Sequence, residues 1–380
     1  MDTSRKHGFS RRKFLHDLGM TGLGLPLISS MMHCENKNEQ KLKELQKKSG
    51  KLGIALVGLG GYAGGQLAPA LQKTEHCYLA GIVTGTPSKI PDWRSKYDIP
   101  EKNVYNYENF DEIANNPDID IVYIVLPNSM HAEYSIRASN AGKHVICEKP
   151  MAITVGECDR MIAAAKKAGK QLSIGYRLHF DPFNLEMARL GQQKIYGEIK
   201  KMTARFSFVA PKGIWRLDKK MAGGGPLMDL GVYCLQGVCY TTGMEPVAVT
   251  AQSPPVSDPG KFIDIEETLS FQMEMPNGLI AECRTSYSES DNMLRAEAER
   301  GWFELSPAYS YGNLKGRSSE GPMNFAPVSQ QARQMDAFAL SIKNNKPSIV
   351  SGEMGRRDMK IITAIYEAMR TGKRVPIKPD

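Results

Sequence analysis

A glycine-rich turn between a buried strand and a helix constrains the fold of this chain more than any other feature of the sequence. The apolar run 52–57 is followed at once by Gly-Leu-Gly-Gly-Tyr-Ala, and a helical pattern covers 66–71. In this order Gly58 permits a tight turn, Gly60 lets the backbone approach a pyrophosphate, and the small Ala63 lets the helix pack against the strand. The phosphates of such a ligand bind at the N-terminus of the helix. The sequence therefore predicts a Rossmann dinucleotide-binding unit, with a plain glycine turn as the alternative.

The rhythm of the chain changes near Tyr176. Before it, apolar runs alternate with helical patterns, and the expected strands are 52–57, 78–83, 118–126, 144–147 and 171–176. Beyond it, apolar and polar side chains alternate, as in antiparallel strands, at 197–208, 245–252, 266–275 and 279–287. Helical spacing covers 180–190 and 361–370. We therefore predict an α/β fold with a Rossmann domain at 52–176 and a second domain at 177–380 built on an antiparallel sheet.

The end of the second strand bears on the choice of dinucleotide. It continues as Thr84-Gly85-Thr86-Pro87-Ser88-Lys89, whereas an NAD-specific site normally has Asp or Glu here to bind the ribose hydroxyls. Hydroxyl groups together with Lys89 suit a 2′-phosphate instead. The sequence therefore favours NADP and leaves the use of NAD open.

Polar residues follow the next two strands, at the edge where an open parallel sheet binds its ligands. Asn128 and His131 come after the 118–126 strand, and Glu148-Lys149-Pro150 comes after the 144–147 strand. Lys149 is thus placed to meet a substrate and to act on a proton. The alternatives are that Lys149 is a surface lysine paired with Glu148, and that Asn128 and His131 only cap the next helix.

A second cluster follows Trp215-Arg216. Three glycines and a proline, 223–226, predict a rigid start to a helix on which Asp229 and Tyr233 are four residues apart and share a face. The carboxylate would orient the phenol, and a nearby lysine cation would favour the phenolate, which would make Tyr233 an acid or base. The alternative is that Tyr233 packs in the core with its hydroxyl on Asp229.

The positive charge of the chain belongs to its first 51 residues. The formal net charge is +8, and residues 1–51 hold eleven Lys and Arg against five Asp and Glu, which leaves +2 for the rest. No basic patch with interleaved aromatic residues follows, so we expect no nucleic-acid partner. Hydrophobic residues make up 41% of the chain, as in ordinary globular proteins.

Residues 1–34 have the pattern of a twin-arginine export signal. Arg11-Arg12 precede a mildly apolar stretch at 18–32, and a charged tether at 35–51 follows. We therefore expect export to the periplasm, with a chance Arg-Arg pair as the alternative. Cys34 stands where an acylated lipoprotein cysteine would, but no small residues precede it, so lipid anchoring and soluble release both stay open.

The other six cysteines are scattered without the spacing of a metal site or a disulfide framework. They are Cys77, Cys147, Cys158, Cys234, Cys239 and Cys283. We expect buried thiols and no metal.

Several collinear motifs together resemble the Gfo/Idh/MocA oxidoreductases, and within that family the glucose-fructose oxidoreductase branch. The resemblance runs from about Leu52 to Ile377 through Gly-Leu-Gly-Gly-Tyr-Ala, Leu-Pro-Asn-Ser-Met-His, Cys-Glu-Lys-Pro-Met, Ile-Gly-Tyr-Arg, Trp-Arg-Leu and Gly-Gly-Gly-Pro-Leu-Met-Asp. It implies a C-terminal α/β domain with a large, mostly antiparallel open sheet, and a homo-oligomer, dimer or tetramer, formed through the sheet faces. It also implies Lys149 as the catalytic residue, with Asp229 and Tyr233 as its partners.

The same resemblance implies the wider site. The cofactor would contact Gly58, Gly60, Gly61, Tyr62, Ala63, Thr84, Gly85, Ser88, Lys89, Leu126, Pro127, Asn128, His131, Glu148, Lys149, Arg177, Trp215 and Arg216. The substrate would contact Lys149, Tyr176, Arg177, Asp229, Tyr233 and Tyr287.

The expected function is an NADP-dependent sugar oxidoreductase that passes a hydride between a sugar's C1 and nicotinamide. NAD-dependent glycoside hydrolysis is an alternative that His in place of Tyr233 would favour, and a cofactor-retaining sugar-binding protein without turnover is another. The glucose-fructose enzymes carry a proline-rich arm, whereas the tether 35–51 has no proline. A non-releasable cofactor is therefore not implied.

Overall fold

The computed structural model describes residues 50–378, and the chain from Leu52 onward forms one compact unit. The expected export signal, Cys34 and nearly all of the tether lie outside the described residues.

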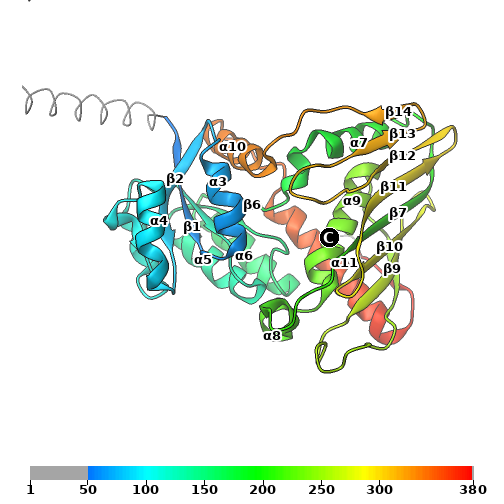
Figure 1. The fold of residues 1–380 in the computed structure, drawn as a ribbon, viewed down its shortest axis with the longest axis horizontal. Coiled ribbons are helices and arrows are strands. Elements are labelled where there is room, and N and C mark those ends of the chain that lie inside the picture. The colour runs from blue at the N-terminus through cyan, green and yellow to red at the C-terminus, as the bar shows by residue number, and fades with distance from the viewer. Residues whose placement is uncertain (1–49, 379–380) are drawn as a thin grey trace, which may run out of the picture. The chain divides into compact units, whose positions relative to one another are not determined.

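The first half of this unit is built on a six-stranded parallel sheet (Figure 1). The sheet order is β3-β2-β1-β4-β5-β6, with β1 at Leu52–Val57, β2 at Cys77–Val83, β3 at Val104–Tyr105, β4 at Ile121–Ile124, β5 at His144–Cys147 and β6 at Leu172–Ile174. Between the strands lie α3 at Ala68–Leu71, α4 at Ile90–Tyr97, α5 at His131–Asn140 and α6 at Val155–Lys167. The order reverses between β1 and β4, and a ligand crevice opens at the carboxyl ends of strands at such a point.

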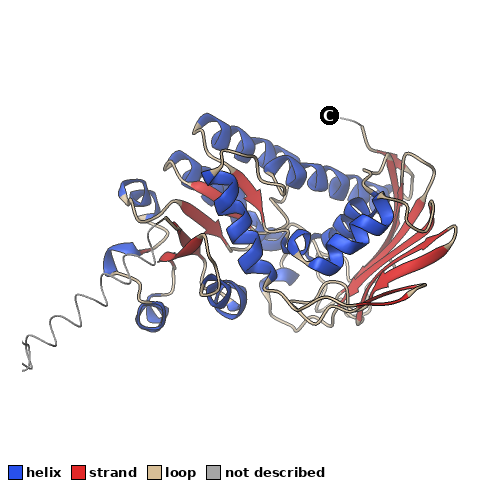
Figure 2. Cartoon of the chain, turned by 90° about the horizontal axis from the view of Figure 1, so that it is seen from above, coloured by secondary structure: helices blue, strands red, loops and turns tan. Residues whose placement is uncertain are grey.

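The second half is built on a nine-stranded sheet that is antiparallel except where β7 pairs with β10. Its order is β14-β13-β12-β11-β7-β10-β9-β8-β15, with β7 at Ile199–Ser207, β8 at Ala248–Gln252, β9 at Thr268–Glu274, β10 at Ile280–Ser286, β11 at Asp291–Ala298, β12 at Gly301–Leu305, β13 at Gly316–Ser318, β14 at Gly321–Met323 and β15 at Val375–Pro376. Figure 2 shows helices on one face of this sheet, where α7 at Pro182–Gln192, α9 at Val232–Thr242 and α11 at Gly352–Thr371 contact its strands. The predicted fold class is confirmed.

One helix of the second half, α10 at Gln330–Lys343, packs against the first sheet. Its side chains Ala332, Met335 and Phe338 are buried in the same apolar cluster as Ile54 and Leu56 of β1. Figure 1 shows α10 beside β2 and α3. Sequence order and spatial grouping therefore differ here, and the boundary between residues 176 and 177 stays a prediction.

A buried carboxylate, that of Glu266, holds the backbone where the glycine run 223–225 leads into the helix that contains α9. Helix α8, at Lys219–Ala222, ends at Gly223, whose φ of 81° is left-handed. Glu266 then accepts hydrogen bonds from the backbone N–H groups of Gly225 (3.0 Å) and Leu227 (3.1 Å). A Cβ on Gly225 would lie 2.4 Å from the carbonyl oxygen of Glu266, so no larger residue fits there.

The helix that follows starts with a π-helical turn at Leu227–Gly231 before it becomes α9. A π-turn closes its hydrogen bonds between residues i and i+5 rather than i and i+4. The start of this helix is therefore wider than the regular α-helix that the sequence pattern predicts.

Candidate active site

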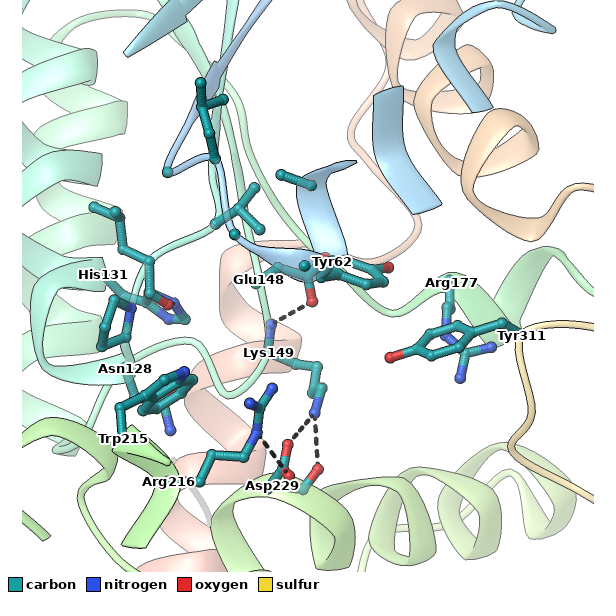
Figure 3. Close-up of a pocket in the computed structure, with 18 of the residues that line it drawn as sticks. Tyr62, Asn128, His131, Glu148, Lys149, Arg177, Trp215, Arg216, Asp229 and Tyr311 are labelled. Atoms are coloured by element: carbon teal, nitrogen blue, oxygen red, sulfur yellow. Dashed lines mark hydrogen bonds and ion pairs between the residues drawn. The ribbon is translucent and has the colours of Figure 1, made fainter. Parts of the chain in front are cut away.

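A cleft of about 710 Å³ lies beside the glycine-rich turn 58–63 that follows β1, which we call the fingerprint turn (Figure 3). The cleft extends from this turn to the loops beside the second sheet. Its walls come from the carboxyl ends of β1, β2, β4 and β5 and from the start of α9. This is the crevice that the reversal of strand order predicts.

The fingerprint turn fits a dinucleotide. Gly58 has φ 94°, and a Cβ there would lie 2.5 Å from the carbonyl oxygen of Val125. A Cβ on Gly60 or Gly61 would meet no atom of the described chain within 4 Å. Packing within the protein therefore does not require these two glycines, and their bare backbone leaves the cleft open to a pyrophosphate.

The β2 end of the cleft suits a 2′-phosphate. Thr84, Thr86 and Lys89 line it, and the ammonium Nζ of Lys89 donates a 2.8 Å hydrogen bond to the carbonyl oxygen of Leu59 in the fingerprint turn. This contact holds a cation beside the turn. The ring of Tyr107 adds an aromatic wall, and a Cβ on Gly85 would collide with it at 2.7 Å.

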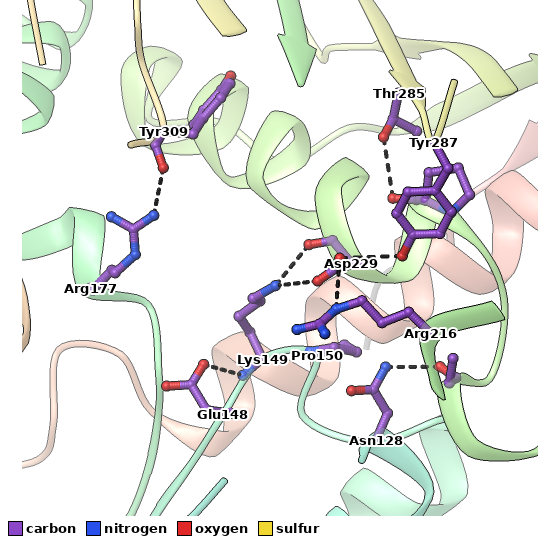
Figure 4. A network of polar contacts seen from close by, with 12 residues as sticks. Asn128, Glu148, Lys149, Pro150, Arg177, Arg216, Asp229, Thr285, Tyr287 and Tyr309 are labelled. Carbon is purple, nitrogen blue, oxygen red and sulfur yellow. Dashed lines mark hydrogen bonds and ion pairs between the residues drawn. The ribbon is translucent and has the colours of Figure 1, made fainter. Parts of the chain in front are cut away.

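Lys149 reaches from the end of β5 to the start of the α9 helix. Its Nζ donates to the backbone carbonyl oxygen of Asp229 (2.8 Å) and to Asp229 Oδ1 (3.0 Å), as Figures 3 and 4 show. Nζ also lies 4.6 Å from the ring centroid of Tyr233. Burial lowers the pKa of Lys149, but Tyr233 and Asp229 outweigh this effect and leave its pKa raised. The side chain is therefore an ammonium cation at neutral pH.

Asp229 is surrounded by donors. Besides Lys149, its Oδ2 accepts hydrogen bonds from Arg216 Nε (3.0 Å) and from the hydroxyl of Tyr287 (3.2 Å; Figure 4). Burial raises the pKa of Asp229, but the two cations outweigh it and hold the pKa at about 2. Asp229 is therefore a fixed anion that positions cations and does not exchange protons at neutral pH.

The expected pairing of Asp229 with Tyr233 is not what the structure shows. The side-chain partners of Asp229 are Lys149, Arg216 and Tyr287. These three partners come from other parts of the chain and take up the Asp229 carboxylate, so helical spacing does not decide its contacts. The prediction that Asp229 orients the Tyr233 phenol is therefore wrong. The alternative, in which the Tyr233 hydroxyl bonds Asp229 in the core, is wrong as well.

Arg177 also lies close to the ring of Tyr233. Its guanidinium carbon lies 5.3 Å from the Tyr233 ring centroid and 4.3 Å from that of Tyr311. The guanidinium is buried and donates to the backbone carbonyl oxygens of Tyr309 (2.6 Å) and Ser310 (2.9 Å). The Tyr233 ring therefore lies close to two cations, Lys149 and Arg177.

Two residues beside the strand ends, Glu148 and His131, tie the cleft wall together. Glu148 accepts a 2.7 Å hydrogen bond from the hydroxyl of Tyr123, and burial raises the pKa of Glu148. The ring nitrogens of His131 lie 2.8 and 2.9 Å from the carbonyl oxygens of Pro150 and Leu126.

Asn128 donates to the carbonyl oxygen of Ala222 at the end of α8. Helix α5 begins after Met130 without a side-chain cap. The alternative that Asn128 and His131 only cap the next helix is therefore wrong.

Most predicted site residues lie in one cleft. Its wall includes Gly58, Gly60, Gly61, Tyr62, Ala63, Thr84, Lys89, Leu126, Pro127, Asn128, His131, Glu148, Lys149, Arg177, Trp215, Arg216, Asp229 and Tyr233. Four predicted residues are not on this wall, namely Gly85, Ser88, Tyr176 and Tyr287. Tyr287 is buried and supports Asp229 from behind, so its contact with a substrate stays a prediction.

Most of the cleft-wall residues that the sequence did not predict belong to the second half of the chain. The missed residues are Leu59, Tyr107, Val125, Phe206, Phe208, Leu230, Asn292, Tyr309, Ser310 and Tyr311. Asn292 holds the loop between β12 and β13, because its Oδ1 accepts hydrogen bonds from the N–H groups of Ala308 (2.8 Å) and Tyr309 (2.9 Å). Two tyrosines close together in a loop were the available signal.

The chain matches one protein family along most of the described unit. Residues 52–176 match the oxidoreductase family with an NAD-binding Rossmann fold, GFO_IDH_MocA, and residues 184–304 match the GFO/IDH/MocA C-terminal domain. The chain belongs to the Gfo/Idh/MocA oxidoreductase family. The prediction of a dinucleotide-dependent oxidoreductase is thereby confirmed.

Named relatives of this oxidoreductase include sugar enzymes. The crystal structure of aldose-aldose oxidoreductase from Caulobacter crescentus, complexed with glycerol, is 41% identical, has a TM-score of 0.84 and covers 86% of this chain and 99% of that one. D-xylose 1-dehydrogenase [NADP(+)] of Haloarcula marismortui is 28% identical over 334 residues, 85% of this chain and 92% of the relative. D-glucoside 3-dehydrogenase of Escherichia coli is 25% identical over 355 residues, which cover 87% of this chain and 98% of the relative. The expected carbohydrate oxidoreductase fits these relatives.

Two further observations concern the described residues alone. They contain no helix long and apolar enough to cross a membrane and no group of three or more His, Cys, Asp and Glu side chains arranged to hold a metal ion. All six cysteines after Cys34 are buried thiols.

Proposed function

We propose that this enzyme is an NADP-dependent sugar oxidoreductase that transfers a hydride between C1 of an aldose and the cofactor. The observation that carries the proposal is the cluster at the carboxyl edge of the first sheet, where the Lys149 ammonium lies between the Asp229 carboxylate and the Tyr233 ring. This cluster shares one cleft with the fingerprint turn. The sugar dehydrogenases and the aldose-aldose oxidoreductase among the relatives support the substrate class.

The nicotinamide group, when bound, accepts or returns a hydride at its ring. The residues supply the rest. Asp229 fixes the ammonium of Lys149 and the guanidinium of Arg216 at the floor of the cleft. Lys149 stabilises negative charge that develops on the sugar hydroxyl oxygen, and Tyr233 exchanges the hydroxyl proton. Phe206, Phe208 and Trp215 give the cleft the apolar faces against which a sugar ring packs.

NADP is the proposed cofactor because the β2 end of the cleft offers Thr84, Thr86 and Lys89 to a phosphate. A charge-assisted hydrogen bond contributes about 1.5–3 kcal/mol, which corresponds to a preference of roughly tenfold or more. Calorimetry should show NADP binding more tightly than NAD, and Lys89→Ala should weaken NADP more than NAD. Equal affinities of the two cofactors for the unaltered protein would contradict the assignment.

One experiment tests the proposed reaction against its alternatives. Purified protein with NADP or NAD is incubated with aldoses, ketoses and nitrophenyl glycosides while the nicotinamide and nitrophenol absorbances are recorded. We expect nicotinamide reduction with one or more aldoses. Nitrophenol release without net reduction would instead support glycoside hydrolysis, and no change with any sugar would support a binding protein.

The location and assembly of the enzyme belong to the same proposal. The pattern of residues 1–34 supports export to the periplasm by the twin-arginine route, with Cys34 as a candidate lipid anchor. The nine-stranded sheet, with helices on one face, supports a homo-oligomer, dimer or tetramer, formed through the other face. Sedimentation of the purified protein would test the assembly.

A further inference from the structure

Glu148 is a buried carboxyl on the wall of the cleft to which the proposed reaction gives no role. It follows β5 directly, precedes Lys149 in the chain and is 9% exposed. A Cβ on Gly175 would lie 2.6 Å from Glu148 Oε1 and 2.9 Å from Oε2, so a glycine is needed to leave room for this carboxyl group. The group is therefore held in a fixed place beside the catalytic lysine.

A chain of two hydrogen bonds joins this carboxyl group to helix α10. The side-chain amide nitrogen of Gln334 donates to the hydroxyl oxygen of Tyr123 (3.0 Å), and that hydroxyl donates to Glu148 Oε1 (2.7 Å). The backbone N–H of Lys149 donates to Glu148 Oε2 at 3.3 Å, as Figures 3 and 4 show. Both carboxyl oxygens therefore accept a hydrogen bond, and such bonds favour the ionised form of the group.

Gln334 sets the direction of this chain. Because its amide nitrogen can only donate, the Tyr123 hydroxyl keeps its single hydrogen for Glu148. Burial raises the pKa of Glu148, and the hydrogen bond from Tyr123 is the largest of the effects that lower it again. The charges of Lys149 and Arg177 also lower the pKa of Glu148. Helix α10, which returns from the second half of the chain, thus supports the charge of a residue in the cleft.

The charge of Glu148 matters because the cleft near Lys149 is rich in cations. On the described wall, the cations of this part are Lys149, Arg177 and Arg216, and the anion besides Glu148 is Asp229. The charge of Glu148 also reaches the fingerprint turn, where burial and then this charge raise the pKa of Tyr62. An oxidised nicotinamide ring brings one more positive charge, whereas the reduced ring is neutral. A second anion in the wall therefore favours the oxidised ring by charge alone.

We propose that Gln334 and Tyr123 hold Glu148 as an anion in the cleft, and that this anion strengthens the binding of the oxidised nicotinamide cofactor relative to the reduced one. The proposal rests on the proposed function, which supplies the nicotinamide. Tyr123 and Gln334 are positioning residues, because they act on the cofactor through Glu148. Such a site shifts the equilibrium of the bound reactants toward oxidised cofactor and reduced sugar.

The other titratable groups that face Glu148 keep their charge as the pH is lowered from about 8 to about 5. They are Tyr62 after β1, Tyr123 on β4, Cys147 and Lys149 at the end of β5, Arg177 after β6 and Tyr311 in the loop between β12 and β13. Burial raises the pKa of the three tyrosines and of the thiol, so these groups stay neutral. Burial lowers the pKa of Lys149 and Arg177, but neighbouring groups, Tyr233 first among them, outweigh it and leave both cationic.

The test measures cofactor binding and needs no sugar. Calorimetry of the purified protein gives the Kd of NADP⁺ and the Kd of NADPH over a series of pH values, and the ratio of the two constants is the readout. The two forms share their phosphates and riboses, so effects on those parts cancel in the ratio. Glu148→Gln keeps the size of the side chain but removes its charge. It should weaken NADP⁺ relative to NADPH by roughly tenfold or more.

The pH series tests the positioning residues. In the unaltered protein the preference for NADP⁺ should decline as the pH falls through the pKa of Glu148, because the carboxyl group is then neutral. Tyr123→Phe removes a hydrogen bond that lowers this pKa, so the decline should begin at a higher pH, and the ratio should return to that of the unaltered protein at high pH. Gln334→Leu should move the decline in the same direction by less. Glu148→Gln should show no decline.

Tyr105→Phe is the matched control. It removes a buried hydroxyl on β3 that accepts a 2.8 Å hydrogen bond from Asn116 and is not on the described wall of the cleft, so the ratio should stay unchanged at every pH. A reversed chain, in which a protonated Glu148 donates to Tyr123, would make the ratios of Glu148→Gln and the unaltered protein equal and would overturn the proposal.

Two further outcomes are decisive. If Glu148→Gln does not fold, an identical pH dependence of the ratio in Tyr123→Phe and the unaltered protein overturns the proposal without it. Inactivity with every sugar, together with a ratio that depends on Glu148, would refute the proposed function alone.

Discussion

Tyr233 is the residue on which proton transfer in the proposed reaction depends. Its ring lies close to both the Lys149 ammonium and the Arg177 guanidinium. Tyr233→Phe should lower kcat by roughly 10²- to 10⁴-fold, the range of general acid-base catalysis, and should leave NADP affinity unchanged. Lys149→Met should cost at least as much, and the double variant should lose little more than the worse single variant because the residues act as a unit. Normal turnover by Tyr233→Phe would show that the hydroxyl plays no chemical part.

Asp229 links the site to stability at low pH. Its pKa is lowered from 3.8 to about 2, because Lys149 and Arg216 outweigh burial. The unfolded chain therefore binds more protons than the folded chain between these values. Its contribution to stability is present above about pH 4 and is lost as the pH falls through about 2, a loss of about 2 kcal/mol.

Denaturant unfolding at a series of pH values measures this contribution. Asp229→Asn should lack the loss below about pH 4, and at neutral pH it should be less stable by about 3–5 kcal/mol, because two buried cations lose their anion. Equal pH slopes in the variant and the unaltered protein would show that the carboxylate is not coupled to the cations.

At the level of elements, the start of α9 depends on a glycine. Because a Cβ on Gly225 would meet backbone of Glu266 at 2.4 Å, Gly225→Ala should displace the turn that presents Asp229 and cost about 1–3 kcal/mol. Gly156→Ala, in the first turn of α6, is the control, since its Cβ would meet only Arg160 at 3.9 Å. Calorimetry should give a lower Tm for the first variant alone. An unchanged Tm of Gly225→Ala would show that the backbone of this turn can shift to make room for the Cβ without loss of stability.

The elements that the sequence predicted well are those with a clear apolar pattern. Strands β1, β7, β9 and β10 lie inside their expected ranges, and so does β5, which ends just before Glu148 and Lys149. The strands β11–β14 were missed, because β13 and β14 have three residues each and β11 carries charged side chains at Asp291, Arg295 and Glu297. The spacing of Asp229 and Tyr233 suggested that they pair, whereas the Asp229 carboxylate binds Lys149, Arg216 and Tyr287 from distant parts of the chain. Helical spacing cannot rank such tertiary contacts, although the family resemblance did imply that Asp229 and Lys149 are partners.

For the molecule as a whole, the site could be predicted in part because its Rossmann half is encoded locally. The fingerprint, the β2 end and the Glu148-Lys149 pair each follow a strand, and parallel strands bring their carboxyl ends to one edge. The other half comes from β7, β11 and the loop at 306–315, which tertiary packing alone brings to the cleft. The return of α10 to the first sheet is likewise a long-range contact that residue patterns do not specify.

The twin-arginine pattern predicts that the enzyme is exported in its folded state, and the state of its cysteines is relevant to this prediction. Six buried thiols without a disulfide suit a protein that folds in the reducing cytoplasm and is exported folded. A bound dinucleotide would leave with such a protein.

Replacing Arg11 and Arg12 with Lys keeps the charge but removes the pair that the export receptor reads, so precursor should accumulate in the cytoplasm. The control is Lys13→Arg, which keeps the pair and should be exported normally. Periplasmic enzyme at the normal level from the double-lysine variant would contradict the export assignment, whereas loss of export with full activity in the cytoplasmic fraction would show that the cofactor is acquired before transport.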